Sequence, residues 1–243
     1  MSVRSNGHEE RALTVLDGAD LGRLKSLAER CINQLELSLE GLTVYTEAAS
    51  GPYVFDPVLA AMSGARRVYA VTADSSYATS ADVERATMEA AAFAGVADRI
   101  LVTTQKFADQ LGESDIITNS GFVRPIDATT LRSLKATAVV PLMWETWEFR
   151  DSDLDLDACQ SLGILVMGTD EGRPPFPMYS YVGLLALKLL FELGLEGLRT
   201  RVLLLGGGKM GEAITDVLER CGAHMTCIAG DAAYDRLAER GLA

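Results

Sequence analysis

The feature that most constrains the fold is a glycine-rich segment, GGGKMG, at residues 206–211. The residues before it, RVLLL, have the apolar composition of a buried strand, and the residues after it follow a helical pattern up to the turn CGA at 221–223. A second short apolar run, HMTCIA, comes next. Strand, glycine loop, helix and strand in this order predict a parallel βαβ unit. The alternative is a glycine-rich turn that is shaped only for packing.

The spacing of Gly206, Gly208 and Gly211 satisfies the pattern GxGxxG. In a dinucleotide-binding unit the first glycine allows a tight turn, the second lets the backbone approach the pyrophosphate, and the third lets helix and strand pack closely. The phosphates bind at the N-terminus of the helix. We therefore expect NAD or NADP to bind at Gly206, Gly207, Gly208, Lys209, Met210 and Gly211.

The choice between the two cofactors stays open at this point. An acidic residue at the end of the second strand normally accepts the ribose hydroxyls of NAD. The sequence has Ala229 and Gly230 there, and Asp231 follows one or two positions late. Asp231 is the candidate ligand, and a pocket that admits the 2′-phosphate of NADP is the alternative. A complete nucleotide domain has several further strands, so we expect a fragment, a unit completed by a partner chain, or a reduced half-domain.

Upstream of the loop, short runs rich in β-branched residues alternate with helical stretches, most of which end in a glycine suited to a C-cap. This alternation predicts an α/β fold, with a parallel sheet that carries helices on both faces. An antiparallel α+β arrangement is the alternative. The expected strands are residues 42–48, 66–74, 99–104, 116–121, 137–143 and 164–171.

Leucine spacing and prolines predict how the chain is divided. Leucines at helical spacing predict a helical segment at residues 1–40. Three prolines among residues 174–177 resist both helix and sheet, which predicts a linker or hinge. We expect a parallel-sheet domain at 41–175, a linker and connecting helix at 176–200, and a partial nucleotide-binding unit at 201–243.

Composition and charge exclude several classes of protein. The formal net charge of −12 repels a polyanion, so nucleic acid is not an expected partner. The longest apolar stretch, residues 179–193, is shorter than the roughly 20 residues of a membrane span, and no membrane partner is expected. The N-terminal residues lack the apolar core of a secretory signal, which predicts a cytoplasmic protein. Four cysteines without a CxxC pair and two histidines give no reason to expect a bound metal.

Two segments resemble the D-isomer-specific 2-hydroxyacid dehydrogenases of the formate/glycerate dehydrogenase-like superfamily. They are ESDIITNSGFVRPIDATTLRSLKATAVV at 113–140 and DLDLDACQSLGILVMGT at 153–169, followed by the linker, the apolar helix and the glycine loop in the family's order. The resemblance implies a flavodoxin-like substrate domain that leads into an incomplete Rossmann domain, with ligand in the cleft between them. Residue by residue, it carries over only the three motif glycines, because the family's catalytic Arg, Glu and His lie beyond the second strand of its nucleotide domain.

Polar residues after the expected strands are the candidates for substrate binding, because ligands of parallel sheets collect beyond the carboxyl ends of the strands. One such cluster, TEAASGPY, contains Glu47, and TNSGFVR supplies the candidates Asn119, Ser120 and Arg124. The alternative is that Ser, Asn and Asp cap the next helices and that the acidic side chains are solvated.

The segment MWETWEFR at 143–150 is the least typical of a plain loop, because both tryptophans of the chain lie there beside two carboxylates. Trp144 and Trp147 are candidates for a ring-lined substrate pocket, and Glu145 and Glu148 for an acid and base. The family holds a substrate carboxylate with a glycine-rich loop at this place, so we do not expect an ordinary 2-hydroxy acid. Packing of the tryptophans is the alternative.

Two functions are consistent with these patterns. The first is an NAD(P)-binding oxidoreductase that acts on a small polar hydroxy or oxo substrate in an interdomain cleft. The second is a non-catalytic nucleotide- or metabolite-binding protein, a degenerate dehydrogenase, that assembles with a partner chain. An incomplete sheet has an open edge, which predicts a homo-oligomer in either case.

Overall fold

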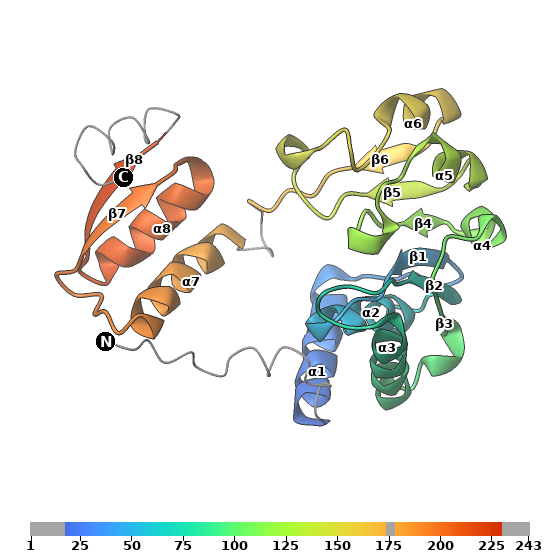
Figure 1. Ribbon diagram of the computed structural model, residues 1–243, viewed down its shortest axis with the longest axis horizontal. Helices are drawn as coiled ribbons and strands as arrows, with labels where there is room; N and C mark the ends of the chain where they lie inside the picture. The colour runs from blue at the N-terminus through green and yellow to red at the C-terminus, as the bar shows by residue number, and fades with distance from the viewer. Residues whose placement is uncertain (1–17, 174–177, 230–243) are drawn as a thin grey trace. The chain divides into compact units, whose positions relative to one another are not determined.

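The computed structural model describes residues 18–173 and 178–229 (Figure 1). The chain divides into two compact units, Met1–Thr169 and Asp170–Ala243, called the first and the second unit below. The division falls just after the last strand of the first sheet and shortly before the proline-rich segment. The finer division into four segments stays a prediction.

The first unit is built on a six-stranded parallel sheet in the order β3-β2-β1-β4-β5-β6. All six expected strands are present and the predicted α/β class is confirmed. The order 3-2-1-4-5-6 is that of doubly wound dinucleotide folds, whereas the flavodoxin order is 2-1-3-4-5. The strands are β1 Thr43–Glu47, β2 Arg67–Val71, β3 Ile100–Thr103, β4 Ile116–Ile117, β5 Val139–Pro141 and β6 Leu165–Met167.

Helices cover both faces of this sheet, because successive strand residues point to opposite sides. Val44 of β1 belongs to the core formed with α1 (Gly18–Leu35), α2 (Asp56–Met62) and α3 (Ser80–Ala94). Its neighbour Tyr45 belongs to the core on the other face, beneath α4 (Ala108–Glu113), α5 (Ala128–Ser133) and α6 (Leu156–Leu162). Short 3-10 turns complete the unit: η1 Gly51–Phe55, η2 Ala97–Arg99, η3 Gly121–Val123 and η4 Thr146–Glu148.

Polar residues cap three of the helices, although the candidates Ser50, Ser120 and Glu145 make no side-chain cap hydrogen bond. The side chain of Thr79 accepts a hydrogen bond at the start of α3, and Asp127 and Asp155 do the same for α5 and α6. Gly95 and Gly163 end α3 and α6 in the left-handed conformation. These caps fix where each helix begins and ends relative to the sheet.

The second unit is a parallel βαβ arrangement with one additional helix. Strands β7 (Arg201–Leu205) and β8 (His224–Ile228) pair in parallel, and α8 (Gly208–Arg220) connects them. Helix α7 (Met178–Glu192) packs along α8, as Figure 1 shows. A Cβ atom on Gly183 would lie 2.5 Å from the carbonyl oxygen of Ala213, so the absence of a side chain at Gly183 permits this close packing.

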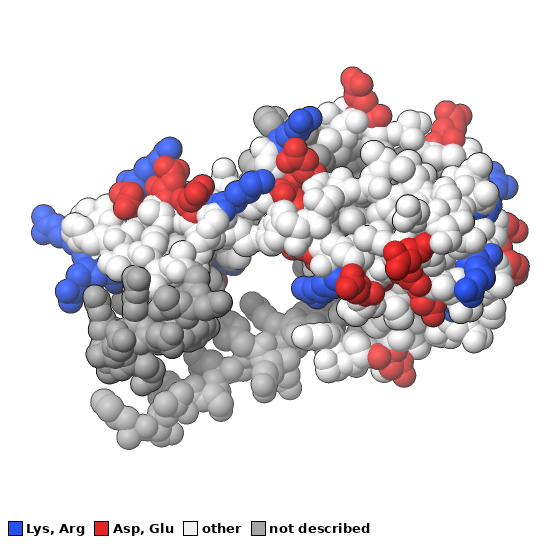
Figure 2. Space-filling view, turned by 90° about the horizontal axis from the view of Figure 1, so that it is seen from above, with Lys and Arg blue, Asp and Glu red and all other residues white. Residues whose placement is uncertain are grey.

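Acidic and basic side chains both occur on the face of the described residues that Figure 2 shows. No broad basic area of the kind that contacts a nucleic-acid backbone is visible on that face. None of the helices within the described ranges has the length and continuous apolar sequence that a membrane crossing requires. Within the same ranges, no three His, Cys, Asp or Glu side chains are grouped so that they could hold a metal ion.

Candidate functional site

The glycine loop joins β7 to α8 and has an unusual backbone. Gly206 has φ of +136° and Gly208 has φ of +64°, both in the region that favours glycine. A Cβ atom on either residue would meet no other atom within 4 Å, so both face open space. Gly207 is different, because a Cβ there would lie 2.9 Å from the Cβ of Ala229. The loop therefore presents bare backbone on one side and contacts the end of β8 on the other.

The amides of the loop decide whether an anion can bind. The amide of Gly206 donates to the carbonyl of Ile228 at 2.9 Å and so extends the pairing of β7 with β8. The amides of Gly207, Gly208 and Met210 donate no hydrogen bond within the part of the chain that the structure describes. They lie at the positive end of α8, where an anion is favoured. The geometry of the loop thus fits the phosphates of a dinucleotide.

The remaining loop residues have more ordinary surroundings. A Cβ on Gly211 would lie 3.7 Å from the carbonyl oxygen of Gly206, a normal contact distance, so packing alone does not require glycine there. The ammonium of Lys209 lies 5.2 Å from the ring centroid of Tyr179. Asp231, the expected ligand of the ribose, lies outside the described residues, so its role stays a prediction.

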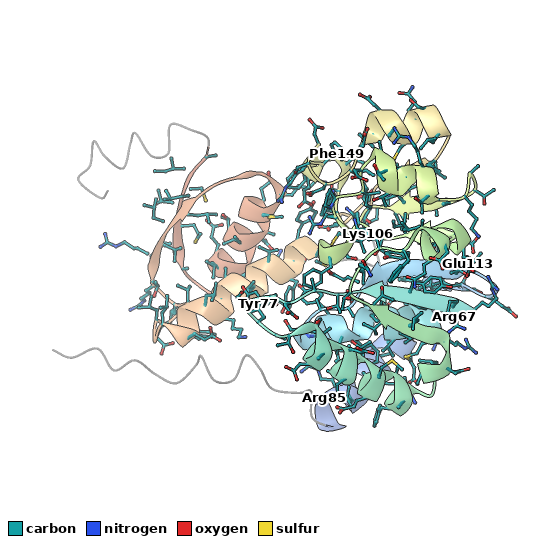
Figure 3. The ribbon with its side chains drawn as sticks, turned by 45° about the vertical axis from the view of Figure 1, so that its right-hand side comes forward. Arg67, Tyr77, Arg85, Lys106, Glu113 and Phe149 are labelled. Carbon is teal, nitrogen blue, oxygen red and sulfur yellow. The ribbon has the colours of Figure 1, made fainter. Side chains whose placement is uncertain are left out.

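A second candidate site lies in the first unit, where the connections reverse direction between β1 and β4. Parallel sheets bind ligands at such a switch point, beyond the carboxyl ends of the strands. Figure 3 labels Tyr77 at this end of the sheet, and Arg67 and Glu113 at the opposite end of the strands. A crevice of about 530 Å³ opens here, lined by Glu47, Ala49, Ser50, Tyr53, Ser75, Tyr77, Val83, Gly121 and Phe122.

Glu47 is the last residue of β1 and is 6% exposed. Its Oε2 accepts a hydrogen bond from the backbone amide of Phe122 at 2.8 Å, which ties β1 to the turn after β4. A Cβ on Gly121 would lie 2.9 Å from the same oxygen, so glycine at this position allows the close approach. The carboxylate is therefore held in place by the backbone of a neighbouring strand connection.

A second carboxyl group, that of Asp56, lies close enough to Glu47 to feel its charge. Burial, together with the negative charge of Glu47, raises the pKa of Asp56 from 3.8 to about 7. Asp56 lines a neighbouring, mostly apolar cavity of about 460 Å³, to which Thr118 and Ser120 also contribute. Sequence reasoning missed Asp56. Its signal was a single acidic residue within the apolar run VFDPVLAA.

The predicted substrate residues of the TNSGFVR segment are held by other protein groups. Asn119 is fully buried, and its Oδ1 accepts from the amide of Met143 at 2.7 Å, while its Nδ2 has no partner within the described residues. Arg124 forms an ion pair with Asp153 at 3.0 Å. Ser120 lines the cavity next to Asp56, and none of the three lines the crevice at Glu47. Their substrate role stays a prediction.

Both tryptophans of the segment MWETWEFR contact other protein groups. Trp144 packs partly buried on the core, and the guanidinium of Arg124 lies 5.0 Å from its ring centroid. Trp147 is 62% exposed, and its indole N–H donates to Glu145 Oε2 at 2.8 Å. Glu145 and Glu148 lie at the start and end of the turn η4. The structure thus gives both rings a packing or hydrogen-bonding partner, and the acid and base roles stay predictions.

None of the protein-family models matches the chain, and no curated protein matches it. Among solved structures, it is similar to the A chain of dipicolinate synthase from Bacillus subtilis, with 13% identity and a TM-score of 0.47 over 85% of this chain and 67% of that one. It is also similar to an NAD+-bound 3-phosphoglycerate dehydrogenase from Entamoeba histolytica, with 12% identity and a TM-score of 0.39 over 77% of this chain and 53% of that one.

A third similar structure is the shikimate 5-dehydrogenase of Listeria monocytogenes, solved with shikimate and NAD. Its identity is 13% and its TM-score 0.39, over 59% of this chain and 51% of that one. A putative D-3-phosphoglycerate dehydrogenase from Ralstonia solanacearum is also among the similar structures. At identities and TM-scores this low, no residue role is taken from these structures.

Proposed function

We propose that the chain is an NAD(P)-binding oxidoreductase that acts on a small polar hydroxy or oxo substrate. The observation that carries the proposal is the loop at the start of α8. Gly206 and Gly208 hold the loop open, and the amides of Gly207, Gly208 and Met210 are available at the positive end of a helix. This is the set of donors that a diphosphate needs.

The two units have separate tasks in this proposal. The loop amides bind the pyrophosphate and so orient the cofactor, which accepts or supplies a hydride when bound. The crevice at Glu47 in the first unit binds the substrate, because it is a concave site at the switch point of that sheet and is larger than the neighbouring cavity at Asp56. The placement of substrate between the two units stays a prediction, and so does the predicted homo-oligomer.

The proposal is tested by titrating the full chain with NADH and following the nicotinamide fluorescence. We expect saturable binding, and we expect Gly208→Asp to weaken it at least about 100-fold, or about 3 kcal/mol. The new carboxylate would occupy the open space in front of the amides and repel the phosphates.

Gly194→Asp is the matched control, because Gly194 also has a positive φ, +73°, and also faces open space. It carries the same strain and the same added charge, but it lies after α7, away from the loop. The control should bind NADH like the unchanged chain. Equal binding by the Gly208 variant, or equal loss in both variants, would remove the support for the phosphate site.

A further inference from the structure

The charged group that lines the crevice of the first unit is negative. Of the nine residues that line it, Glu47 alone is charged, and none is Lys or Arg. A carboxylate or phosphate ligand would therefore meet a negative wall without a positive group to compensate it. The crevice does not fit the anionic 2-hydroxy acids that the family resemblance would imply.

Glu47 is also under-used as a hydrogen-bond acceptor. An ionised carboxylate offers about four acceptor sites on its two oxygens. Here Oε2 accepts from the amide of Phe122, and Oε1 has no hydrogen-bond partner among the described residues, although the residue as a whole is only 6% exposed. Oε1 is not one of the fully buried polar atoms that lack a partner, so it is accessible from outside the protein. The unused oxygen lies in a residue that lines the crevice, where a ligand could supply the missing donor.

The nearby carboxyl of Asp56 adds to this demand for positive charge. Its pKa rises to about 7 through burial and through the negative charge of Glu47, so the two groups repel each other when both are ionised. A cation bound at Glu47 would relieve that repulsion.

The walls of the crevice suit an organic cation. Tyr53 and Tyr77 contribute exposed aromatic side chains, and Phe122 and Val83 add apolar surface. Aromatic ring faces attract ammonium groups, which adds to the attraction of a carboxylate. The hydroxyl of Ser50 provides a polar group beside them.

We propose that this crevice binds an ammonium group, held by Glu47 and flanked by Tyr53 and Tyr77, and that the oxidoreductase's substrate therefore carries a positively charged nitrogen beside an apolar or aromatic body. That the bound ammonium compound is the substrate of the oxidoreductase rests on the proposed function. Ammonium binding at Glu47 stands on the geometry of the first unit alone.

The test uses a pair of probes that differ in charge. Benzylamine, protonated at neutral pH, and benzyl alcohol are titrated into the ¹⁵N-labelled full chain, and the shift of the Phe122 amide is followed, because that amide contacts Glu47. We expect benzylamine to bind about tenfold more tightly than the alcohol, since hydrogen bonds to charged groups are stronger than neutral ones. Benzoate should not bind.

Three variants show whether Glu47 is the cause. Glu47→Gln keeps an acceptor for the Phe122 amide and should reduce benzylamine binding to the level of the alcohol. Ser50→Lys, at a side chain that makes no cap hydrogen bond, should abolish benzylamine binding by placing an ammonium of the protein in the crevice. Glu113→Gln removes the same charge at the opposite end of the strands, where Glu113 accepts from Tyr69, and should leave benzylamine binding unchanged.

The outcomes separate this inference from the proposed function. Equal affinity for amine and alcohol, absence of binding by both, or a preference for the amine that survives in the Ser50→Lys variant would overturn ammonium binding. If Glu47→Gln does not fold, the loss or survival of benzylamine binding in the Ser50→Lys variant decides whether the crevice binds an ammonium group. Gly208→Asp should leave benzylamine binding intact, so a failure of NADH binding and a failure of amine binding are observed independently.

Discussion

The protonation of Asp56 gives a prediction that can be worked out from the structure. In the folded chain its pKa is about 7, raised from 3.8 by burial and by the charge of Glu47. Between about pH 4 and pH 7 the native state therefore keeps a proton that the unfolded chain has lost. The free energy of unfolding falls as the pH rises through this window and changes no further, on this account, above it.

The size of the effect follows from the same numbers. The difference between 3.8 and about 7, at about 1.4 kcal/mol for each pKa unit, corresponds to about 4 kcal/mol at most. Asp56→Asn replaces the group by one that is neutral at every pH. The variant should match the unchanged chain near pH 4, and it should be more stable at pH 8 by about 2 to 4 kcal/mol.

Tryptophan fluorescence is the appropriate assay, because both tryptophans, Trp144 and Trp147, lie in the first unit together with Asp56. Urea unfolding at pH 4.5 and pH 8 gives the free energy for each variant. Asp98→Asn, at an exposed position, is the control and should show the pH dependence of the unchanged chain. If Asp56→Asn were as stable as the unchanged chain at both pH values, the burial and charge coupling of Asp56 would be refuted.

Two further substitutions test the packing that positions the sites. Gly183→Ala would place a Cβ 2.5 Å from a side-chain carbon of Val217, and it should lower the free energy of unfolding of the second unit by about 1 to 3 kcal/mol. The expected readout is faster hydrogen exchange in β7 and β8. Unchanged exchange would contradict the close packing of α7 on α8. Asp155→Ala removes the acceptor for the amide of Ala158 at the start of α6 and should cost about 1 kcal/mol in the tryptophan-monitored transition. Asp155→Asn, which keeps a capping oxygen, should cost less.

The sequence predicted the features that depend on local pattern. Strands such as β1 and β2 appear where short β-branched runs lie between helical stretches, because burial on both faces selects such runs. The glycine loop was predictable for the same reason, since Gly206 and Gly208 occupy backbone conformations that other residues rarely adopt. The strand order was not predictable from these patterns. After β3 the chain crosses back so that β4 pairs with β1 on the side opposite β2, and the composition of the connecting segments does not indicate this direction.

The pairing of carboxyl groups in the first unit could not be predicted either. Glu47 was one of several acidic residues at or just after the end of an expected strand, and nothing in its neighbours distinguished it. What distinguishes it is the contact with Phe122, which is distant in the chain, and the approach of Asp56 after the turn η1. Conversely, the composition of the MWETWEFR segment drew attention to Trp147, whose indole donates to the carboxylate two residues away.

The strand order of the first sheet raises the question of why the dinucleotide is assigned to the second unit. A sheet of order 3-2-1-4-5-6 normally binds a pyrophosphate after its first strand, on glycine amides that open a helix. In the first unit that place holds the buried carboxylate of Glu47 and the turn η1, where Pro52 has no amide to donate. A diphosphate would be repelled there. In the second unit the corresponding place after β7 carries Gly206 and Gly208 instead. The glycine amides there favour an anion, whereas the carboxylate of Glu47 in the first unit favours a cation.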